Sequence, residues 1–499
     1  MRYYLGIDIG TFESKGCLVD QTGSIIVSAA RPHTMMVPQA GWAEHSVEED
    51  WWGDFTFISK KLIAESKVNP ADIKAVATSG IGPCMLPVDK FGKPLMNAVL
   101  YGVDTRAAAE IAELNLHIGE KRILDFCGNA LTSQSVGPKI LWLKKNRPDI
   151  YANTHKILNC NSYLNFKLTG HYVIDHYSAS SSAPLYDPSQ LCWSDALTKD
   201  IIDLNKLPDC GWSTDIAGTV TAEASAATGL AEGTPVTFGT IDAAAEAISV
   251  GVLAPGDMMI MYGSTVFIIA ITQKRVRDVR LWYAPWLFPG QHASMAGLAT
   301  SGTLTHWFRE HLAKELDPAE AIIKLSAEAQ SSPPGAHGLV TLPYFSGERT
   351  PIHDTSAKGI IFGLNLTHNR GDLFRSFLEG IAFGTCHALE TFGAVGETPR
   401  NIFAVGGGTK NKVWLQATSD ISAKAQTLRE KSIGASYGNA FLAAIALGDA
   451  EPGDINGWNP IIEQIIPSQE SASIYAKHYQ IFTDLYERNK DLMAHVTEK

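Results

Sequence analysis

The most informative part of this sequence is residues 235–248, PVTFGTIDAAAEAI, in which a short apolar run passes into an alanine-rich segment. The apolar run is typical of a strand, Gly239 and Thr240 allow a turn, and the alanines favour a helix. The pattern therefore predicts that Asp242 lies where a strand passes into a helix. Asp is a favoured N-cap, which accounts for this residue without any chemistry. A carboxylate at the same position can instead accept a hydrogen bond from a substrate hydroxyl and orient it for attack on phosphorus.

The composition is that of a globular α/β protein with more than one domain. The 499 residues exceed the size at which single hydrophobic cores stop growing, so two domains are expected. Hydrophobic residues make up 45%, charged residues make up 19%, and there are 43 glycines, which is typical of a turn-rich fold. The formal net charge of -11 argues against a nucleic-acid-binding surface.

Neither a membrane location nor a structural metal is predicted. The first residues run directly into a strand without a signal-peptide pattern, and no apolar run is long enough to cross a bilayer. The seven cysteines are scattered, without CxxC or Cys/His metal spacing, and suggest reduced thiols. We therefore expect a cytoplasmic protein with no membrane or nucleic-acid partner and no structural zinc.

The beginning of the chain reads as a β-hairpin with a glycine and a hydroxyl residue at its tip. Residues 4–20 alternate as strand, tight turn and strand. The tip, Gly10-Thr11, exposes backbone N–H groups and a hydroxyl that could hold a phosphate, and Lys15 could reach the same group as a point charge. Asp8 could face a Mg²⁺ ion through water. An ordinary hairpin with a polar tip is the alternative reading.

The second half of the chain repeats this design. Residues 258–262 and 266–272 read as two apolar strands around the tip Gly263-Ser264-Thr265, and Gly302 lies at a small-residue opening to a later helix. A duplicated hairpin implies two related halves facing across a cleft. We therefore expect ATP between two domains, with one tip on each side of its phosphates.

These motifs resemble those of a known family. The pattern Asp8-x-Gly10-Thr11 is similar to the phosphate hairpin of the sugar kinase, Hsp70 and actin superfamily, and its spacing to Lys15 is similar to that in FGGY carbohydrate kinases. Residues 347–351 match the GERTP loop of these kinases, which chaperones and actins lack. The resemblance covers essentially the whole chain, and within the family it is strongest to the xylulokinase branch.

The resemblance implies an α/β fold of two ribonuclease-H-like domains with an interdomain cleft. Residues 1–250 would form the sugar-binding domain with the catalytic aspartate, and residues 251–499 the nucleotide-binding domain with a C-terminal helix. Asp242 lies at the position of the catalytic aspartate in the family's GxxDxxxxxxG pattern. The resemblance therefore favours a general-base role for Asp242 over a simple helix cap. Asp8 would be the second catalytic carboxylate and would contact Mg²⁺ through water.

The resemblance also assigns the ligand contacts. Nucleotide binding falls to the two hairpin tips, to Gly302, and to a glycine-rich strand end with the asparagine behind it, namely Gly406, Gly407, Gly408 and Asn411. Sugar binding falls to Asp104 and Arg106 of a WxDxR-like segment, although a surface ion pair is the alternative there. Gly82 and Pro83 lie where xylulokinases carry a Gln-Met-His contact, and Gly102 lies where tryptophan is usual.

The resemblance therefore implies an ATP- and Mg²⁺-dependent kinase that phosphorylates a sugar hydroxyl, with D-xylulose to D-xylulose 5-phosphate as the first expectation. The altered residues at positions 81–83 and 102 leave another ketose, a polyol or a sugar acid open as the substrate. A non-catalytic ATP-binding sensor on the same fold is the alternative from a different class. A small-molecule sugar is the expected partner, and a homodimer is a family expectation only.

Overall fold

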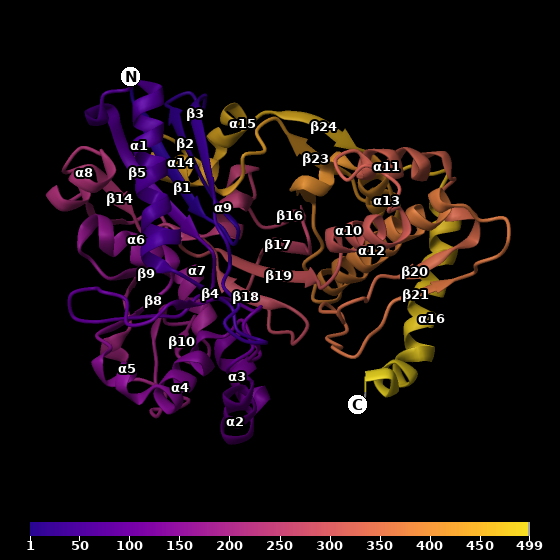
Figure 1. Cartoon of the computed structure of the whole chain (residues 1–499), viewed down its shortest axis with the longest axis horizontal. Helices are drawn as coiled ribbons and strands as arrows, with labels where there is room; N and C mark the ends of the chain where they lie inside the picture. The colour runs from indigo at the N-terminus through magenta and orange to yellow at the C-terminus, as the bar shows by residue number, and fades with distance from the viewer. Residues whose placement is uncertain (498–499) are drawn as a thin grey trace. The chain divides into compact units, whose positions relative to one another are not determined.

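The computed structural model describes residues 1–497, which divide into two compact units (Figure 1). Unit 1 comprises Met1–Pro255, Ile271–Ala293 and Ile433–Pro460. Unit 2 comprises Gly256–Ala270, Ser294–Ser432 and the chain from Ile461 onward. Two segments from the second half of the sequence therefore pack within the unit that contains the first half.

A mixed sheet forms the centre of unit 1, with its strands in the order β13, β14, β5, β1, β2, β3 and with β15 also paired to β5. Strands β1, β2 and β3 are antiparallel, whereas β1, β5, β14 and β15 are parallel. Their bounds are β1 (Tyr3–Ile9), β2 (Glu13–Asp20), β3 (Ile25–Pro32), β5 (Ile73–Gly80), β13 (Ile216–Thr219), β14 (Pro235–Thr237) and β15 (Thr240–Ile241). The carboxyl ends of the parallel strands meet at one edge, where α/β proteins place their ligands.

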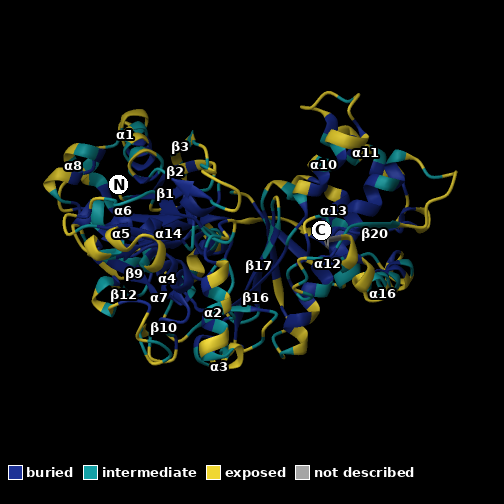
Figure 2. Cartoon of the chain, turned by 60° about the horizontal axis from the view of Figure 1, so that its bottom comes forward, coloured by how far each residue is buried: buried dark blue, intermediate teal, exposed yellow. Residues whose placement is uncertain are grey.

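Helices cover both faces of this sheet. Added to Gly16 in β2, a Cβ atom would collide with Ile58 of α1 (Asp54–Ser66); added to Gly6 in β1, it would collide with the backbone of α14 (Ala435–Ala446). Gly6 and Gly16 lie on opposite faces, because the opposite neighbour of Gly16 is Ile7 and side chains alternate along a strand. Figure 2 shows β1 and β2 buried, while the outer turns of α1 and α8 are exposed.

Unit 1 also contains shorter elements outside this sheet. Its helices are η1 (Val47–Gly53, a π-helical turn), η2 (Pro70–Asp72), α2 (Ala108–Ile118), α3 (Glu120–Cys127), α4 (Val136–Asn146), α5 (Pro148–Asn153), α6 (Cys160–Thr169), α7 (His176–Ala179), η3 (Ser180–Ser182), η4 (Leu204–Lys206), α8 (Ala222–Thr228), α9 (Asp242–Ser249), η7 (Pro452–Asp454) and α15 (Ile455–Trp458). Its short strands are β4 (Glu44–His45), β6 (Leu86–Val88), β7 (Ala98–Val99), β8 (Lys156–Leu158), β9 (Val173–Asp175), β10 (Tyr186–Asp187), β11 (Cys192–Trp193), β12 (Asp209–Gly211) and β18 (Trp282–Pro285).

Unit 2 repeats the same central arrangement. Strands β19 (His292–Leu298), β17 (Val266–Thr272), β16 (Asp257–Tyr262), β22 (Asn401–Val405), β23 (Gln426–Arg429) and β24 (Ile461–Ile465) follow one another in this order. Strands β16 and β17 form an antiparallel hairpin, and β22 pairs with β16 in parallel, as β5 pairs with β1. The duplicated hairpin predicted from the sequence is therefore confirmed.

A long buried helix, α12 (Arg370–Ala394), packs against α11 (Ala321–Ser331) and α13 (Lys412–Ser422) in unit 2. The other elements are α10 (Gly302–Leu312), η5 (Ala336–Gly338), β20 (Val340–Leu342), β21 (Ile360–Phe362), η6 (Gly407–Lys410) and α16 (Ala472–Thr497). Within residues 1–497, no helix is both long enough and apolar enough to cross a membrane.

Candidate active site

Three polar residues form a row across the carboxyl edge of the sheet in unit 1. Asp8 in β1 lies opposite Ser79 in β5, and Ser79 lies opposite Thr240 in β15. The Ser79 hydroxyl donates a hydrogen bond to Asp8 Oδ1 at 2.7 Å and accepts one from Asn439 Nδ2 at 2.7 Å. Asp8 is thus a buried carboxylate whose orientation is fixed by its neighbours.

Asp242 lies at the predicted junction between a strand and a helix. Strand β15 ends at Ile241, and Asp242 is the first residue of α9. One carboxylate oxygen, Oδ1, accepts the N–H of Ala243 at 2.7 Å. Among residues 1–497 no donor reaches the second oxygen, Oδ2. The carboxylate therefore does not make the usual cap to an N–H two or three residues on, and one oxygen is left for another partner.

Burial raises the pKa of the carboxyl groups at this edge. It raises the pKa of Asp8 to about 6, against the opposing effects of the Ser79 hydroxyl and Lys15. The pKa of Asp242 lies well above its usual value because of burial and the nearby charge of Asp8. Carboxyl groups with raised pKa values are suited to accept a proton near neutral pH.

Glu246 is a third carboxyl group in this cluster, and the sequence motifs did not single it out. Burial and Asp8 raise its pKa to about 7, while Lys15 and the Ala435 N–H act in the opposite direction. Its carboxylate occupies the space into which a side chain at Gly434 would extend. The signal that could have found it is its position four residues after Asp242, on the same face of α9.

The tip of the first hairpin is a tight turn around Gly10 and Thr11. The Gly10 N–H donates to the Glu13 carbonyl at 3.2 Å, and a Cβ atom on Gly10 would lie only 2.7 Å from that oxygen. Lys15, opposite Asp8 on β2, is half-exposed, and its Nζ lies 3.2 Å from Glu13 Oε2. The predicted phosphate contacts Gly10, Thr11 and Lys15 are thus neighbours of Asp8.

The tip of the second hairpin is held by the start of α10. The Gly263 carbonyl accepts the Gly302 N–H at 3.0 Å, and the Ser264 carbonyl accepts the Thr303 N–H at 3.1 Å. A Cβ atom on Gly302 would overlap the Gly263 carbonyl oxygen. Glycine is therefore required at position 302 for this close approach, which places Gly302 behind the tip formed by Gly263, Ser264 and Thr265.

The glycine-rich loop after β22 also requires small residues. A Cβ atom on Gly406 would lie 2.7 Å from the Tyr262 carbonyl oxygen, and one on Gly408 would lie 2.6 Å from the Trp414 ring. Gly407 has no neighbouring atom in the direction of a Cβ. Asn411 caps α13, accepting the Trp414 N–H at 3.1 Å. Its predicted contact with the nucleotide therefore stays a prediction.

On the predicted sugar side, the segment 81–83 packs directly beside Asp242. A Cβ atom on Gly82 would lie 2.7 Å from Cγ1 of Ile241, the residue before Asp242. Gly82 and Pro83 are half-buried. The structure thus brings Gly82 next to Asp242, while a direct contact with a sugar remains a prediction.

Asp104 and Arg106 form a fully buried ion pair rather than a surface one. Arg106 Nη2 lies 2.8 Å from Asp104 Oδ2 and 2.8 Å from Glu44 Oε1, and the Ala43 N–H donates to the same Asp104 oxygen. The guanidinium stacks 3.8 Å above the centre of the Trp42 ring. The pair mainly satisfies itself: of the side-chain polar atoms of Asp104 and Arg106, only Nη1 of Arg106 is buried without a partner among residues 1–497.

Gln134 is a further polar residue in this region that the motifs did not reveal. Its Oε1 accepts the Gly102 N–H at 3.1 Å, and a Cβ atom on Gly102 would lie 2.7 Å from its Nε2. The Gln134 amide thus occupies the place of the missing side chain at position 102. No spacing rule predicts this contact, because it joins two loops about 30 residues apart.

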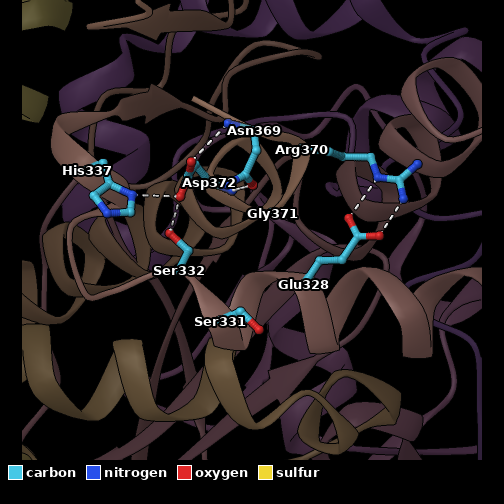
Figure 3. A pocket seen from close by; sticks show the side chains of 8 residues that line it. All are labelled: Glu328, Ser331, Ser332, His337, Asn369, Arg370, Gly371 and Asp372. Carbon is cyan, nitrogen blue, oxygen red and sulfur yellow. Dashed lines mark hydrogen bonds and ion pairs between the residues drawn. The ribbon is translucent and has the colours of Figure 1, made fainter. Parts of the chain in front are cut away.

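Unit 2 contains a separate cavity of about 440 Å³ (Figure 3). Its polar groups are paired with one another: Arg370 with Glu328, and Asp372 with His337 and Ser332. None of the residues that line it is among the predicted site residues. The lining residues are Glu328, Ser331, Ser332, His337, Asn369, Arg370, Gly371 and Asp372.

The duplicated hairpins, the carboxylates at the strand ends and the glycine-rich loops are the features expected of a sugar kinase, and comparison with known proteins agrees. The chain belongs to the FGGY family of carbohydrate kinases: the model of the N-terminal domain matches residues 3–249, and that of the C-terminal domain matches residues 258–447. It is therefore a carbohydrate kinase, which transfers a phosphoryl group to an alcohol group. The predicted α/β fold of the actin and hexokinase superfamily is confirmed.

Individual relatives extend over the whole chain. It is 28% identical to a xylulose kinase of Bacillus subtilis, over 100% of this chain and 98% of that protein. It is equally identical, 28%, to a ribulokinase of Geobacillus thermodenitrificans, over 97% of this chain and 94% of that protein. The crystal structure of xylulose kinase from Rhodospirillum rubrum covers 99% of this chain and 100% of its own, with a TM-score of 0.91 and 30% identity. The predicted resemblance to xylulokinases is confirmed.

Proposed function

We propose that this kinase transfers the γ-phosphoryl group of ATP to a hydroxyl of a ketose, with D-xylulose as the first candidate and Asp242 as the general base. The observation that carries the proposal is the Asp242 carboxylate, which keeps one oxygen without a donor among residues 1–497 and has a raised pKa beside Asp8. Such a group can accept the hydrogen bond of a substrate hydroxyl. Because phosphoryl transfer has a loose transition state, Asp242 needs to take the proton only late.

The residues around Asp8 suit a magnesium ion held mainly by water and phosphate. Asp8 keeps Oδ2 without a partner among residues 1–497, and the same part of the chain has no group of three His, Cys, Asp or Glu side chains able to hold a metal. Mg²⁺ typically takes one or two carboxylates together with substrate phosphates. When bound, the ion neutralises charge on the phosphates. Asp8 would orient it through water.

Phosphate binding falls to the two hairpin tips in this proposal. Each tip lies between antiparallel strands and presents backbone N–H groups beside a hydroxyl side chain, Thr11 in unit 1 and Ser264 and Thr265 in unit 2. Lys15 adds a positive charge near Asp8 and Glu246. In the loop 406–408, no neighbouring atom lies in the direction of a Cβ on Gly407, which leaves the backbone open there to the nucleoside.

An ADP-release assay on a substrate panel tests the proposal. The purified protein, ATP and Mg²⁺ are combined with pentuloses, hexuloses, polyols and sugar acids, and ADP is measured against a blank without sugar. Strong turnover with D-xylulose is the expected result. Turnover with another compound alone would keep the kinase mechanism and overturn the choice of sugar.

We expect Asp8→Asn to raise the Mg²⁺ concentration needed for half-maximal rate by about tenfold or more, because a neutral amide cannot orient the hydrated ion as a carboxylate does. The wild-type rate should also fall as the pH drops through about 6, where Asp8 gains a proton. Mg²⁺ titrations of both proteins check this. An unchanged Mg²⁺ dependence in the variant would remove Asp8 from the metal site.

We expect Gly102→Trp to raise the KM for the sugar about tenfold or more and to leave the KM for ATP nearly unchanged. The indole would displace the Gln134 amide, which occupies this space. In the double variant Gly102→Trp/Gln134→Ala the displaced amide is absent, and folding stability should recover toward wild type. Equal changes in both KM values would place the segment 102–106 outside the sugar site.

A further inference from the structure

Two histidines lie directly behind the tip of the first hairpin. His33 Nε2 lies 3.1 Å from the Gly10 carbonyl oxygen, and His45 Nε2 lies 3.1 Å from the Thr11 carbonyl oxygen. The His33 side chain is 5% exposed, and His45 is fully buried. The two rings pack edge to face, with their centres 5.0 Å apart. Both carbonyls of the turn are therefore held by imidazole donors.

The direction of a carbonyl fixes the direction of the next N–H. In a planar trans peptide, the C=O of one residue and the N–H of the following residue point in opposite directions. The His33 contact therefore turns the Thr11 N–H away from the rings, and the His45 contact does the same for the Phe12 N–H. Among residues 1–497, neither of these N–H groups has a hydrogen-bond partner. They are donors that point away from the two rings.

The surroundings of His45 fix it as a neutral ring. The Trp51 Nε1–H donates to His45 Nδ1 at 3.1 Å, so Nδ1 is an acceptor and Nε2 carries the hydrogen that Thr11 accepts. Burial and the neighbouring His33 lower the pKa of His45 to about 4, which agrees with this tautomer. One donor and one acceptor are thus all that this position needs.

The surroundings of His33 are different, because both ring nitrogens face acceptors. Nδ1 lies 2.8 Å from Asp54 Oδ2, and Nε2 faces the Gly10 carbonyl. Asp54 is buried and also accepts the Ser14 hydroxyl at 2.6 Å, and Arg31 Nε lies 3.1 Å from its other oxygen. Both contacts of His33 are satisfied together only by the doubly protonated imidazolium.

The charged groups around His33 favour this form. Burial alone lowers the pKa of His33, but its hydrogen bond to Asp54, the charges of Asp54 and Asp50, and the Gly10 carbonyl outweigh burial and raise it. Two neighbouring groups do not favour the positive charge of His33. Arg31 carries the same charge, and His45 is neutral. A raised pKa means that the imidazolium is present at low pH and is lost as the pH rises through that value.

The second tip holds its carbonyls by other means. The Gly263 and Ser264 carbonyls accept the backbone N–H groups of Gly302 and Thr303, which donate at every pH. The Ser301 hydroxyl also donates to Gly263 at 3.1 Å. At both tips the carbonyls accept hydrogen bonds from behind the turn. Titratable side chains donate these bonds at the first tip only.

We propose that His33 and His45 are positioning residues that tie back the carbonyls of Gly10 and Thr11, so that the N–H groups of Thr11 and Phe12 face a phosphate of the nucleotide. This inference rests on the proposed phosphate-binding role of the first tip. His45 acts as a neutral donor, and His33 acts as a charged clamp between Asp54 and the turn. The nucleotide affinity should therefore weaken as the pH rises through the pKa of His33.

Substitutions distinguish this role from a general contribution to folding. Gln can donate to Thr11 and accept from Trp51, so His45→Gln should retain a KM for ATP within about twofold of wild type, whereas His45→Ala should raise it. At position 33 both partners are acceptors, so His33→Gln and His33→Ala should each raise the KM for ATP about 10- to 100-fold, as expected for losing a charge-assisted hydrogen bond. The KM for the sugar should change little.

The decisive measurement is ADP·Mg²⁺ binding by calorimetry for these variants and wild type between pH 6 and 9, together with both KM values. His478→Gln, which removes another buried imidazole in α16, is the matched control and should bind ADP like wild type. Wild type should lose affinity at high pH, and the His33 variants should bind weakly and show a flatter pH profile.

Either of two results would overturn this inference and leave the proposed phosphate site standing. In the first, the alanine variants bind ADP as well as wild type does. In the second, Gln has the same effect on the KM for ATP at positions 33 and 45. Wild type that binds no ADP would overturn the proposed phosphate site together with the inference. If His33→Ala does not fold, the wild-type pH profile and the His45→Gln and His45→Ala pair decide, since a pH-independent affinity contradicts the charged clamp.

Discussion

Asp242→Asn should lower kcat for sugar phosphorylation by about 10²- to 10⁴-fold and leave the affinity for ADP nearly unchanged. This range is the usual contribution of a general base. The amide keeps the shape of the side chain and an oxygen for the Ala243 N–H, so α9 should start as before. It cannot take a proton from the sugar hydroxyl, and it also removes a negative charge beside Asp8.

Steady-state kinetics and ADP calorimetry on the same preparation measure this prediction. Asp209→Asn, at an exposed position in β12, is the control for a lost carboxylate and should keep the wild-type rate. A variant at Asp242 that retains near-normal turnover would exclude this residue as the base. The capping explanation would then account for it.

Gly302→Ala should raise the KM for ATP about tenfold or more, with a smaller effect on the KM for the sugar. The added Cβ atom would overlap the Gly263 carbonyl oxygen, which is backbone and cannot move aside without shifting the second tip. The backbone at position 302 is helical, so alanine causes no strain apart from this collision. The increase in the KM for ATP should therefore reflect a displacement of the second tip.

Gly453→Ala is the matched control, because a Cβ atom there meets no atom within 4 Å. It should leave both KM values and the thermal stability unchanged. Differential scanning fluorimetry with and without ADP separates a displaced tip from a destabilised unit 2. A Gly302→Ala protein with wild-type affinity for ATP would show that the second tip does not contact phosphate.

Much of the geometry of the candidate site could be predicted because its signals are local. The glycine and hydroxyl residues between two apolar runs marked both hairpins, and the apolar-to-alanine transition marked the start of α9 at Asp242. Turn and helix preferences act over a few residues and are therefore legible in the sequence. The family motifs added the order in which these elements occur.

The remaining features depend on pairing between distant segments. Helix α14 packs on β1 in unit 1 because its backbone can approach Gly6 closely. No periodicity in the sequence predicts this contact. The contacts of His33 and His45 with the tip depend on where β3 ends and on the π-helical turn η1, which carries Trp51 to His45. The alternative interpretation of Asp104 and Arg106 as a surface ion pair is wrong, because burial of charge cannot be inferred from residue type.

The most direct test of the central claim is ³¹P NMR of the reaction of wild type with ATP, Mg²⁺ and D-xylulose. The account predicts one new sugar phosphate monoester signal that grows at the same rate as ADP, with no signal from the Asp242→Asn variant on the same timescale. The account would be contradicted if ADP and inorganic phosphate formed but no phosphorylated sugar appeared, both for D-xylulose and for every other sugar of the panel.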